Sequence, residues 1–209
     1  MTPVEILREH WGYDSFRPKQ EEIVLSALDG KDVLAILPTG GGKSVCFQVP
    51  AMMREGIAIV VTPLIALMKD QVQNLNDRGI KALCVNAGMG RREVDLTLNN
   101  AAYGDFKFLY VSPERLGTQL FRQYVREMNV SFIVVDEAHC ISQWGYDFRP
   151  DYLPGAFLHA RFFKIPRRGD LVGRVIQHDL ILVLALIGEG VCLFRHHLAD
   201  HTAEGLQCG

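Results

Sequence analysis

The sequence lacks the marks of a secreted, disulfide-bonded or membrane-spanning protein. Its five cysteines are scattered and form no C-x-x-C pair, which argues against a disulfide framework and against a zinc site. The longest uninterrupted apolar run, Leu180 to Ile187, is far shorter than the ~20 residues of a membrane-spanning helix. No basic segment followed by an apolar one opens the chain, so no secretory signal is expected. These absences predict a cytoplasmic protein with no membrane partner.

An excess of charge of one sign is also lacking. The 209 residues carry a formal net charge of −2, so any contact with nucleic acid has to come from a local basic patch. What the chain does have is apolar material, because 48% of its residues are hydrophobic. That content is enough to bury a real core, and the length suits one domain or one and a half.

Short apolar runs alternate with amphipathic stretches of helical length. Strands are predicted at 33–37, 57–62, 82–86, 106–111 and 132–136, and helices at 2–11, 43–54, 64–78, 91–101 and 113–128. Strands that are apolar throughout and alternate with helices indicate an α/β fold with a mostly parallel sheet covered on both faces. In such sheets binding sites form outside the carboxyl ends of the strands.

A glycine-rich segment follows the first predicted strand and opens the next helix, which is the context that a P-loop requires. Glycines let backbone N–H groups turn toward phosphate oxygens, and the helix adds the positive end of its dipole. Lys43 would reach the β- and γ-phosphates of a nucleoside triphosphate, and Ser44 would ligate Mg²⁺. Leu37 replaces the first glycine of the general pattern, so an incidental glycine-rich turn is the alternative. The predicted cradle is Thr39, Gly40, Gly41, Gly42, Lys43 and Ser44.

Two acids, Asp136 and Glu137, end the last predicted strand at the same edge of the sheet. In P-loop NTPases an acid in this position holds the Mg²⁺, which assigns Asp136 and Ser44 to the metal. Glu137 is suited to orient and deprotonate the attacking water. The alternative is that the acids cap a following helix. Together with the P-loop, they predict a nucleoside triphosphate with Mg²⁺ as cofactors and Lys43, Asp136 and Glu137 as catalytic residues.

The segments FRPKQ, LPTGGGKS and DEAHCISQWGYDFRP resemble the RecQ family of DNA helicases in order and spacing, over roughly residues 5–152. The resemblance implies a RecA-like P-loop NTPase lobe at 1–152. It also implies ATP hydrolysis coupled to single-stranded or forked DNA, and 3′-to-5′ unwinding. A P-loop kinase or a transporter ATPase is a further alternative, but the aromatic loop after the acids and the segment FRPKQ both count against it.

The segment GYDSFRPKQ resembles the part of these helicases that reads adenine. By this resemblance Tyr13 stacks on the base and Arg17 buttresses the nucleotide. Gln20 hydrogen-bonds the adenine edge, because its amide offers one donor group and one acceptor. A plain turn before a helix that starts at Lys19 is the alternative.

A threonine or serine followed by proline stands at two strand-to-helix transitions, in TPLIALMKDQ and SPERL. Each pair predicts an N-cap followed by a first-turn proline. Backbone N–H groups there could hold a DNA phosphate, whereas two ordinary helix starts are the alternative. Both segments resemble strand-tracking motifs of the family. The predicted DNA contacts are Thr62, Pro63, Lys69, Ser112 and Arg115.

Aromatic residues cluster beside an arginine directly after the acids. Trp144 and Phe148 are rigid surfaces on which exposed bases can stack, although a small core staple is the alternative. Arg149 can pair with phosphate or lie against a base. By resemblance His139 links nucleotide state to DNA contact, while a histidine bonded to a nearby carbonyl is the alternative. The predicted coupling residues are His139, Gln143, Trp144, Phe148 and Arg149.

The end of the chain differs in composition. From residue 151 onward the sequence has no Ser, Asn, Met or Trp and holds five of the seven histidines. We therefore expect 153–209 to be a divergent tail, as a truncation, a frameshift or a fused gene fragment would produce. The second motor lobe of the family, with its arginine finger, is not recognised in this tail. A non-catalytic module that binds nucleotide or DNA is therefore the alternative to a working helicase.

Overall fold

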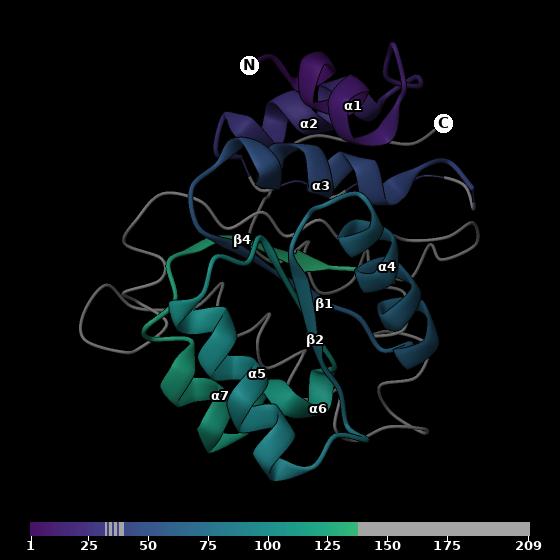
Figure 1. Ribbon diagram of the computed structural model, residues 1–209. Helices are drawn as coiled ribbons and strands as arrows, with labels where there is room; N and C mark the ends of the chain where they lie inside the picture. Colours follow the sequence, from purple (N-terminus) through teal and green to yellow (C-terminus); the bar gives the residue numbers. More distant parts are fainter. Residues whose placement is uncertain (32, 34, 36, 38–39, 138–209) are drawn as a thin grey trace, which may run out of the picture.

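The computed structural model describes residues 1–31, 33, 35, 37 and 40–137 (Figure 1). Within these residues it contains seven helices and four strands. The predicted tail lies outside the described residues, and so do six of the predicted site residues. These six are Thr39, His139, Gln143, Trp144, Phe148 and Arg149.

A parallel sheet with the strand order β2-β3-β1-β4 lies at the centre of the fold. The predicted parallel α/β architecture is therefore confirmed. The first predicted strand lies partly outside the described residues, but Ala35 and Leu37 from it are buried in the core. The strands are β1 (Ile57–Val61), β2 (Ala82–Val85), β3 (Phe108–Val111) and β4 (Val130–Val135).

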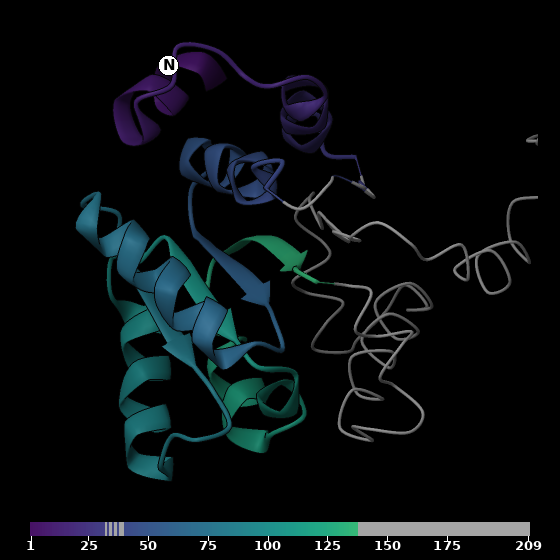
Figure 2. The same ribbon diagram turned by 90° about the vertical axis from the view of Figure 1, so that its right-hand side faces the viewer.

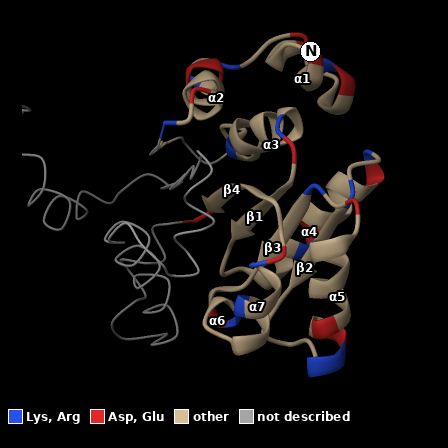
Figure 3. Ribbon diagram, turned by 90° about the vertical axis from the view of Figure 1, so that its left-hand side faces the viewer, with Lys and Arg blue, Asp and Glu red and all other residues tan. Residues whose placement is uncertain are grey.

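Helices cover both faces of the sheet, which explains why the strands carry no charged residue (Figure 3). Ala58 and Val60 of β1 pack into one core cluster with the three helices α2, α3 and α4. Ile59 and Val61 point the other way and pack with α5, α6 and α7. The covering helices are α2 (Gln20–Leu28), α3 (Lys43–Met53), α4 (Ile65–Asp77), α5 (Arg91–Tyr103), α6 (Pro113–Leu116) and α7 (Gln119–Tyr124).

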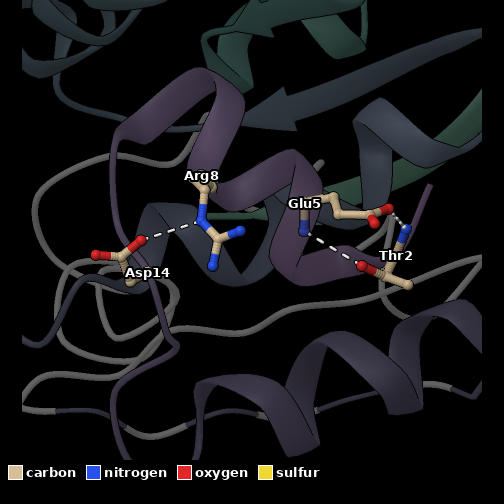
Figure 4. Close-up of polar contacts among 4 residues, drawn as sticks. All are labelled: Thr2, Glu5, Arg8 and Asp14. Atoms are coloured by element: carbon tan, nitrogen blue, oxygen red, sulfur yellow. Dashed lines mark hydrogen bonds and ion pairs between the residues drawn. The ribbon is translucent and has the colours of Figure 1, made fainter.

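Helix α1 (Pro3–Trp11) lies with α2 outside α3, so this side of the sheet carries two helical layers (Figures 1 and 2). A third cluster of apolar side chains, including Leu7, Val24 and Val49, joins the three helices. The predicted start of α1 is confirmed, because the Thr2 hydroxyl accepts a hydrogen bond from the Glu5 N–H at 3.3 Å. The Glu5 carboxylate accepts one from the Thr2 N–H at 2.7 Å, which completes a capping box (Figure 4).

Two helix predictions are wrong in detail. The single helix predicted at 113–128 is two short helices, because Thr118 has extended backbone and its hydroxyl accepts from the Phe121 N–H, which starts α7 anew. Thr62 does not cap α4. Its N–H bonds to the Val111 carbonyl and continues the strand pairing, so α4 begins only at Ile65. Among the described residues, every helix is too short or too polar to cross a bilayer.

Candidate nucleotide-binding site

Each of the four strands is followed directly by a buried polar residue, and these four residues form a row along one edge of the sheet. The strand register pairs Val61 with Val111 and Val135, and Val111 with Val85, so the residues that follow these valines are neighbours in one row. Backbone hydrogen bonds of 2.8–3.1 Å carry the pairing into this row. Across the sheet the row reads Asn86, Ser112, Thr62 and Asp136, and none of the four is more than 5% exposed. Three of them were predicted from the sequence, and Asn86 was missed.

Asp136 and Glu137 lie at the end of β4. Asp136 is 4% exposed, and burial raises its pKa from 3.8 to about 6, with a further contribution from the Glu137 charge. The Glu137 N–H donates to the Asp136 carboxylate at 3.0 Å. Glu137 has a left-handed backbone with φ of 53°, which is uncommon outside glycine and turns the chain sharply out of the strand.

Lys43 in the first turn of α3 reaches this end of β4. Its Nζ lies 3.3 Å from Oε1 of Glu137, and the two side chains are only 14% and 17% exposed. Both β1 and β4 point their arrowheads toward the edge at which α3 begins (Figure 2). The structure thus brings together the three residues predicted to be catalytic, although they lie far apart in the sequence.

Arg17, before α2, and Gln20, at its start, hold the described part of the P-loop. Arg17 donates through Nη1 to the Gly40 carbonyl at 2.8 Å. Gln20 donates through Nε2 to the carbonyls of Gly41 and Gly42 at 3.1 and 3.0 Å. These contacts use the carbonyl oxygens of the three glycines and leave the glycine N–H groups to other partners, as a phosphate cradle requires.

Replacing Gly42 by alanine is expected to weaken nucleotide binding roughly tenfold. Gly40→Ala should only strain the backbone, which lowers the free energy of unfolding by about 1 kcal/mol and leaves nucleotide binding nearly unchanged. Both glycines have left-handed backbones, with φ of 73° and 77°. A Cβ on Gly42 would lie 2.5 Å from Nε2 of Gln20 and displace that amide, whereas a Cβ on Gly40 meets nothing within 4 Å. Titration with a fluorescent ATP analogue measures the difference. Equal affinities of the two variants would contradict it.

A cavity of about 380 Å³ opens beside the P-loop. Five predicted nucleotide ligands line it: Tyr13, Arg17, Gln20, Gly42 and Ser44. It is also lined by residues that the sequence did not single out, from α3, from α4 and from the residue directly after α4: Gln48, Gln71, Asn74 and Arg78.

The backbone around Tyr13 is fixed from both sides. Gly12 ends α1 with a left-handed φ of 73°, and its N–H bonds to the Arg8 carbonyl. Asp14 accepts a hydrogen bond from Nε of Arg8 at 3.0 Å (Figure 4). Tyr13 itself is 51% exposed, so its ring is available to a ligand in the cavity.

The residues at this edge fit a magnesium ion. Among the described residues no three His, Cys, Asp or Glu side chains gather to hold a metal. Mg²⁺, however, is typically bound by one or two protein oxygens together with phosphates and water. Asp136 is a buried carboxylate whose pKa is raised by desolvation and by a like charge, and a bound cation would offset both effects. With the Ser44 hydroxyl it could hold the ion beside a triphosphate.

In metal-free buffer, Asp136→Asn is expected to raise the free energy of unfolding by about 3 kcal/mol near pH 8. Burial raises the pKa of the folded-state carboxyl from 3.8 to about 6. Above about pH 6 the folded protein therefore holds a desolvated charge that the unfolded chain keeps in water. As the pH falls from about 6 toward 4, the wild type takes up this proton on folding and the difference should shrink. Denaturant melts across this pH range would contradict the prediction if the difference stayed constant.

The predicted DNA contacts lie in different surroundings. Thr62 and Ser112 are each 1% exposed, and their hydroxyls are buried without a hydrogen-bond partner in the described structure. Arg115 donates through Nε to the Asn86 carbonyl at 2.9 Å and through Nη2 to two further carbonyls in the loop after β2. It thus anchors α6 to that loop. Lys69 is exposed on α4, and Pro63 is buried.

The chain is similar to known helicases in sequence. A family model of DEAD/DEAH box helicases matches residues 17–156. The ATP-dependent DNA helicase RecQ of Haemophilus influenzae is 45% identical over 165 residues, which are 79% of this chain and 27% of that protein. The probable ATP-dependent DNA helicase RecS of Bacillus subtilis is 46% identical over 149 residues, which are 71% of this chain and 30% of that protein. The chain spans less than a third of either relative.

Solved structures agree on the fold. The helicase MrfA, solved bound to DNA and AMPPNP, matches 90% of this chain and 26% of its own with a TM-score of 0.66 at 16% identity. A hypothetical ATP-dependent RNA helicase from Sulfolobus tokodaii matches 88% of this chain and 50% of its own with a TM-score of 0.58 at 18% identity. The family model and the sequence relatives show that the chain belongs to the DEAD/DEAH box helicase family, as a motor lobe of the RecQ type, and the solved structures agree with its RecA-like fold.

Proposed function

We propose that this chain binds ATP with Mg²⁺ and hydrolyses it, as the nucleotide-binding lobe of an ATP-dependent DNA helicase of the RecQ type. The observation that carries the proposal is the meeting of Lys43 with Asp136 and Glu137 at one edge of a parallel sheet. Further support comes from the relatives, which are named as DNA helicases. By that resemblance the lobe covers residues 1–152 and is followed by the divergent tail. The protein would be cytoplasmic.

The phosphate groups would be held at the start of α3. Lys43 would leave Glu137 for the β- and γ-phosphates, because a triphosphate carries more negative charge than one carboxylate. That exchange would release Glu137 to orient and deprotonate water. Ser44 and Asp136 would hold Mg²⁺, which supplies charge neutralisation at the phosphates when bound.

The base would enter the cavity beside the P-loop. Tyr13 would stack on it, and Arg17 and Gln20 would hold both the nucleotide and the loop, since their side chains already contact the glycine carbonyls. Thr39 would complete the cradle from outside the described residues.

Single-stranded or forked DNA would contact the neighbouring strand ends, with movement in the 3′-to-5′ direction. The position of Thr62 and Ser112 directly after β1 and β3 supports this placement, because binding sites of parallel sheets form outside the carboxyl ends of the strands. Pro63, Lys69 and Arg115 would border the same path. The residues His139, Gln143, Trp144, Phe148 and Arg149 would continue it outside the described structure.

ATP turnover of the purified chain, measured with and without single-stranded DNA, tests the proposal. Turnover that DNA stimulates is the expected result. ATP binding without any turnover would instead support the second candidate, a non-catalytic module that binds nucleotide or DNA. The observation that favours this candidate is the Lys43–Glu137 ion pair, which engages the proposed base in the structure. Failure to bind ATP would overturn the first candidate, and failure to bind either ATP or DNA would overturn both.

A further inference from the structure

The side of the cavity that α4 forms carries an amide group, that of Gln71, whose orientation is fixed by hydrogen bonds. Gln71 of α4 lines the cavity, and its Oε1 accepts a hydrogen bond from the Tyr110 hydroxyl at 2.9 Å and one from Nε2 of Gln48 at 3.4 Å. Tyr110 is fully buried on β3, and Gln48 is 5% exposed on α3. Donors from two elements, β3 and α3, therefore fix the oxygen of this amide. No hydrogen bond within the described part of the chain engages its nitrogen, whose two N–H donors are therefore open to a ligand.

The predicted reader of the base edge is already engaged. Both N–H groups of the Gln20 amide donate to the carbonyls of Gly41 and Gly42. The Gln20 oxygen accepts from the Arg17 N–H at 2.8 Å and keeps one lone pair. As it stands, Gln20 can accept one hydrogen bond from the exocyclic amine of adenine, but it cannot donate to a ring nitrogen. A purine held only by Gln20 would leave its ring acceptors unpaired.

We propose that α4 is the second reader of the nucleotide base, with the Gln71 amide nitrogen donating to a ring nitrogen of the purine and Asn74 assisting it. Asn74 lies three residues farther along α4, which puts it on the same side of the helix. It is exposed and lines the same cavity, and no hydrogen bond engages its amide in the described structure. This inference rests on the proposed function, because it requires that the triphosphate binds at Lys43.

The position of Gln71 also gives α4 a second role. The same helix begins three residues after Thr62 and carries Lys69, both proposed to contact DNA. Gln71 is bonded to Gln48, which lies on the helix that starts at the P-loop. Occupancy of the base pocket would therefore act directly on the helix that carries the proposed DNA contact Lys69.

Gln71→Glu tests the proposal with little change in shape. The substituted carboxylate keeps an oxygen to accept from Tyr110 and Gln48, but it replaces the donating nitrogen by an acceptor. Gln73→Glu is the matched control, because it adds the same charge to the same helix at an exposed position that is bonded to Asp77 and does not line the cavity. Two probes are titrated with Mg²⁺: ATP, and inorganic tripolyphosphate, which has no base.

Relative to Gln73→Glu, the Gln71→Glu variant should bind ATP about five- to tenfold more weakly and tripolyphosphate equally well. Asn74→Ala changes an exposed side chain and should weaken ATP about threefold, again without effect on tripolyphosphate. Unchanged ATP affinity in both variants, or an equal loss for both probes, would overturn the role of α4. A wild-type protein that binds neither probe would instead overturn the proposed function.

Discussion

Lys43→Ala is expected to weaken ATP binding by about 10- to 150-fold. This is the range for removing a hydrogen bond to a charged group. Lys43 is the charged donor in the first turn of α3, and its Nζ already lies 3.3 Å from a carboxylate at the end of β4. Because the side chain is mostly buried, solvent can replace only part of the charge that is lost. Isothermal titration with Mg²⁺ and ATP measures the effect.

The same substitution should disturb the acids even without nucleotide. The Lys43 charge lowers the pKa of Asp136, whereas burial and Glu137 raise it. Removing the lysine leaves two adjacent carboxylates without this cation, so the Asp136 pKa should rise further. Lys31→Ala is a suitable control, because it removes an equally short ion pair, to Asp29, at the exposed surface. If Lys31→Ala and Lys43→Ala bound ATP alike, the phosphate role of Lys43 would be untenable.

Most of the fold could be predicted because its strands are apolar throughout. A run such as Ile57–Val61 is buried at every residue, and that pattern occurs only where both faces of the sheet are covered. The P-loop and the two acids could also be found in the sequence, since each directly follows a predicted strand. Their meeting at one edge then follows from parallel topology alone.

Other features depend on contacts that no local pattern reports. The break between α6 and α7 turns on the Thr118 side chain, which could equally have pointed to solvent within a continuous helix. Arg115 was predicted to add charge for DNA, and its charge gave no sign that its donors would also hold three backbone carbonyls in the loop after β2. The only signal that could have found Asn86 was its place directly after an apolar run.

The α4 side of the cavity was missed for a different reason. Gln71 and Asn74 belong to a polar helix face, and such a face usually meets water. Only the placement of α1 and of the segment after it across α3 and α4 turns this face into the wall of a cavity. That placement depends on packing among Leu7, Val24 and Val49, which are distant in sequence. Periodicity identifies the buried stripe of a helix, but it does not tell which polar residues face a ligand.

Glu137→Gln is expected to have the largest effect on turnover, a fall of about 10²- to 10⁴-fold in the rate of ATP hydrolysis. The amide cannot take a proton from water, but it has nearly the same shape and can keep the left-handed backbone at this position. ATP affinity should stay near that of the wild type or rise, because a negative charge beside the triphosphate is removed. Loss of turnover with retained ATP binding would distinguish the role of Glu137 in hydrolysis from that of Lys43, whose removal weakens ATP binding itself.

Single-turnover hydrolysis with protein in excess, alongside equilibrium binding of ATP, measures the two quantities separately. Glu127→Gln is the control, because Glu127 is an exposed acid that lies away from the P-loop in the turn before β4. A fall in hydrolysis of less than about tenfold in Glu137→Gln would mean that another group takes the proton. Asp136 is then the nearest candidate by position, because its carboxylate accepts a hydrogen bond from the Glu137 N–H. An ionised Asp136 cannot readily do both tasks, however, because binding Mg²⁺ uses the same lone pairs. Retained hydrolysis in Glu137→Gln that still requires Mg²⁺ would therefore point to a base other than Glu137 and Asp136.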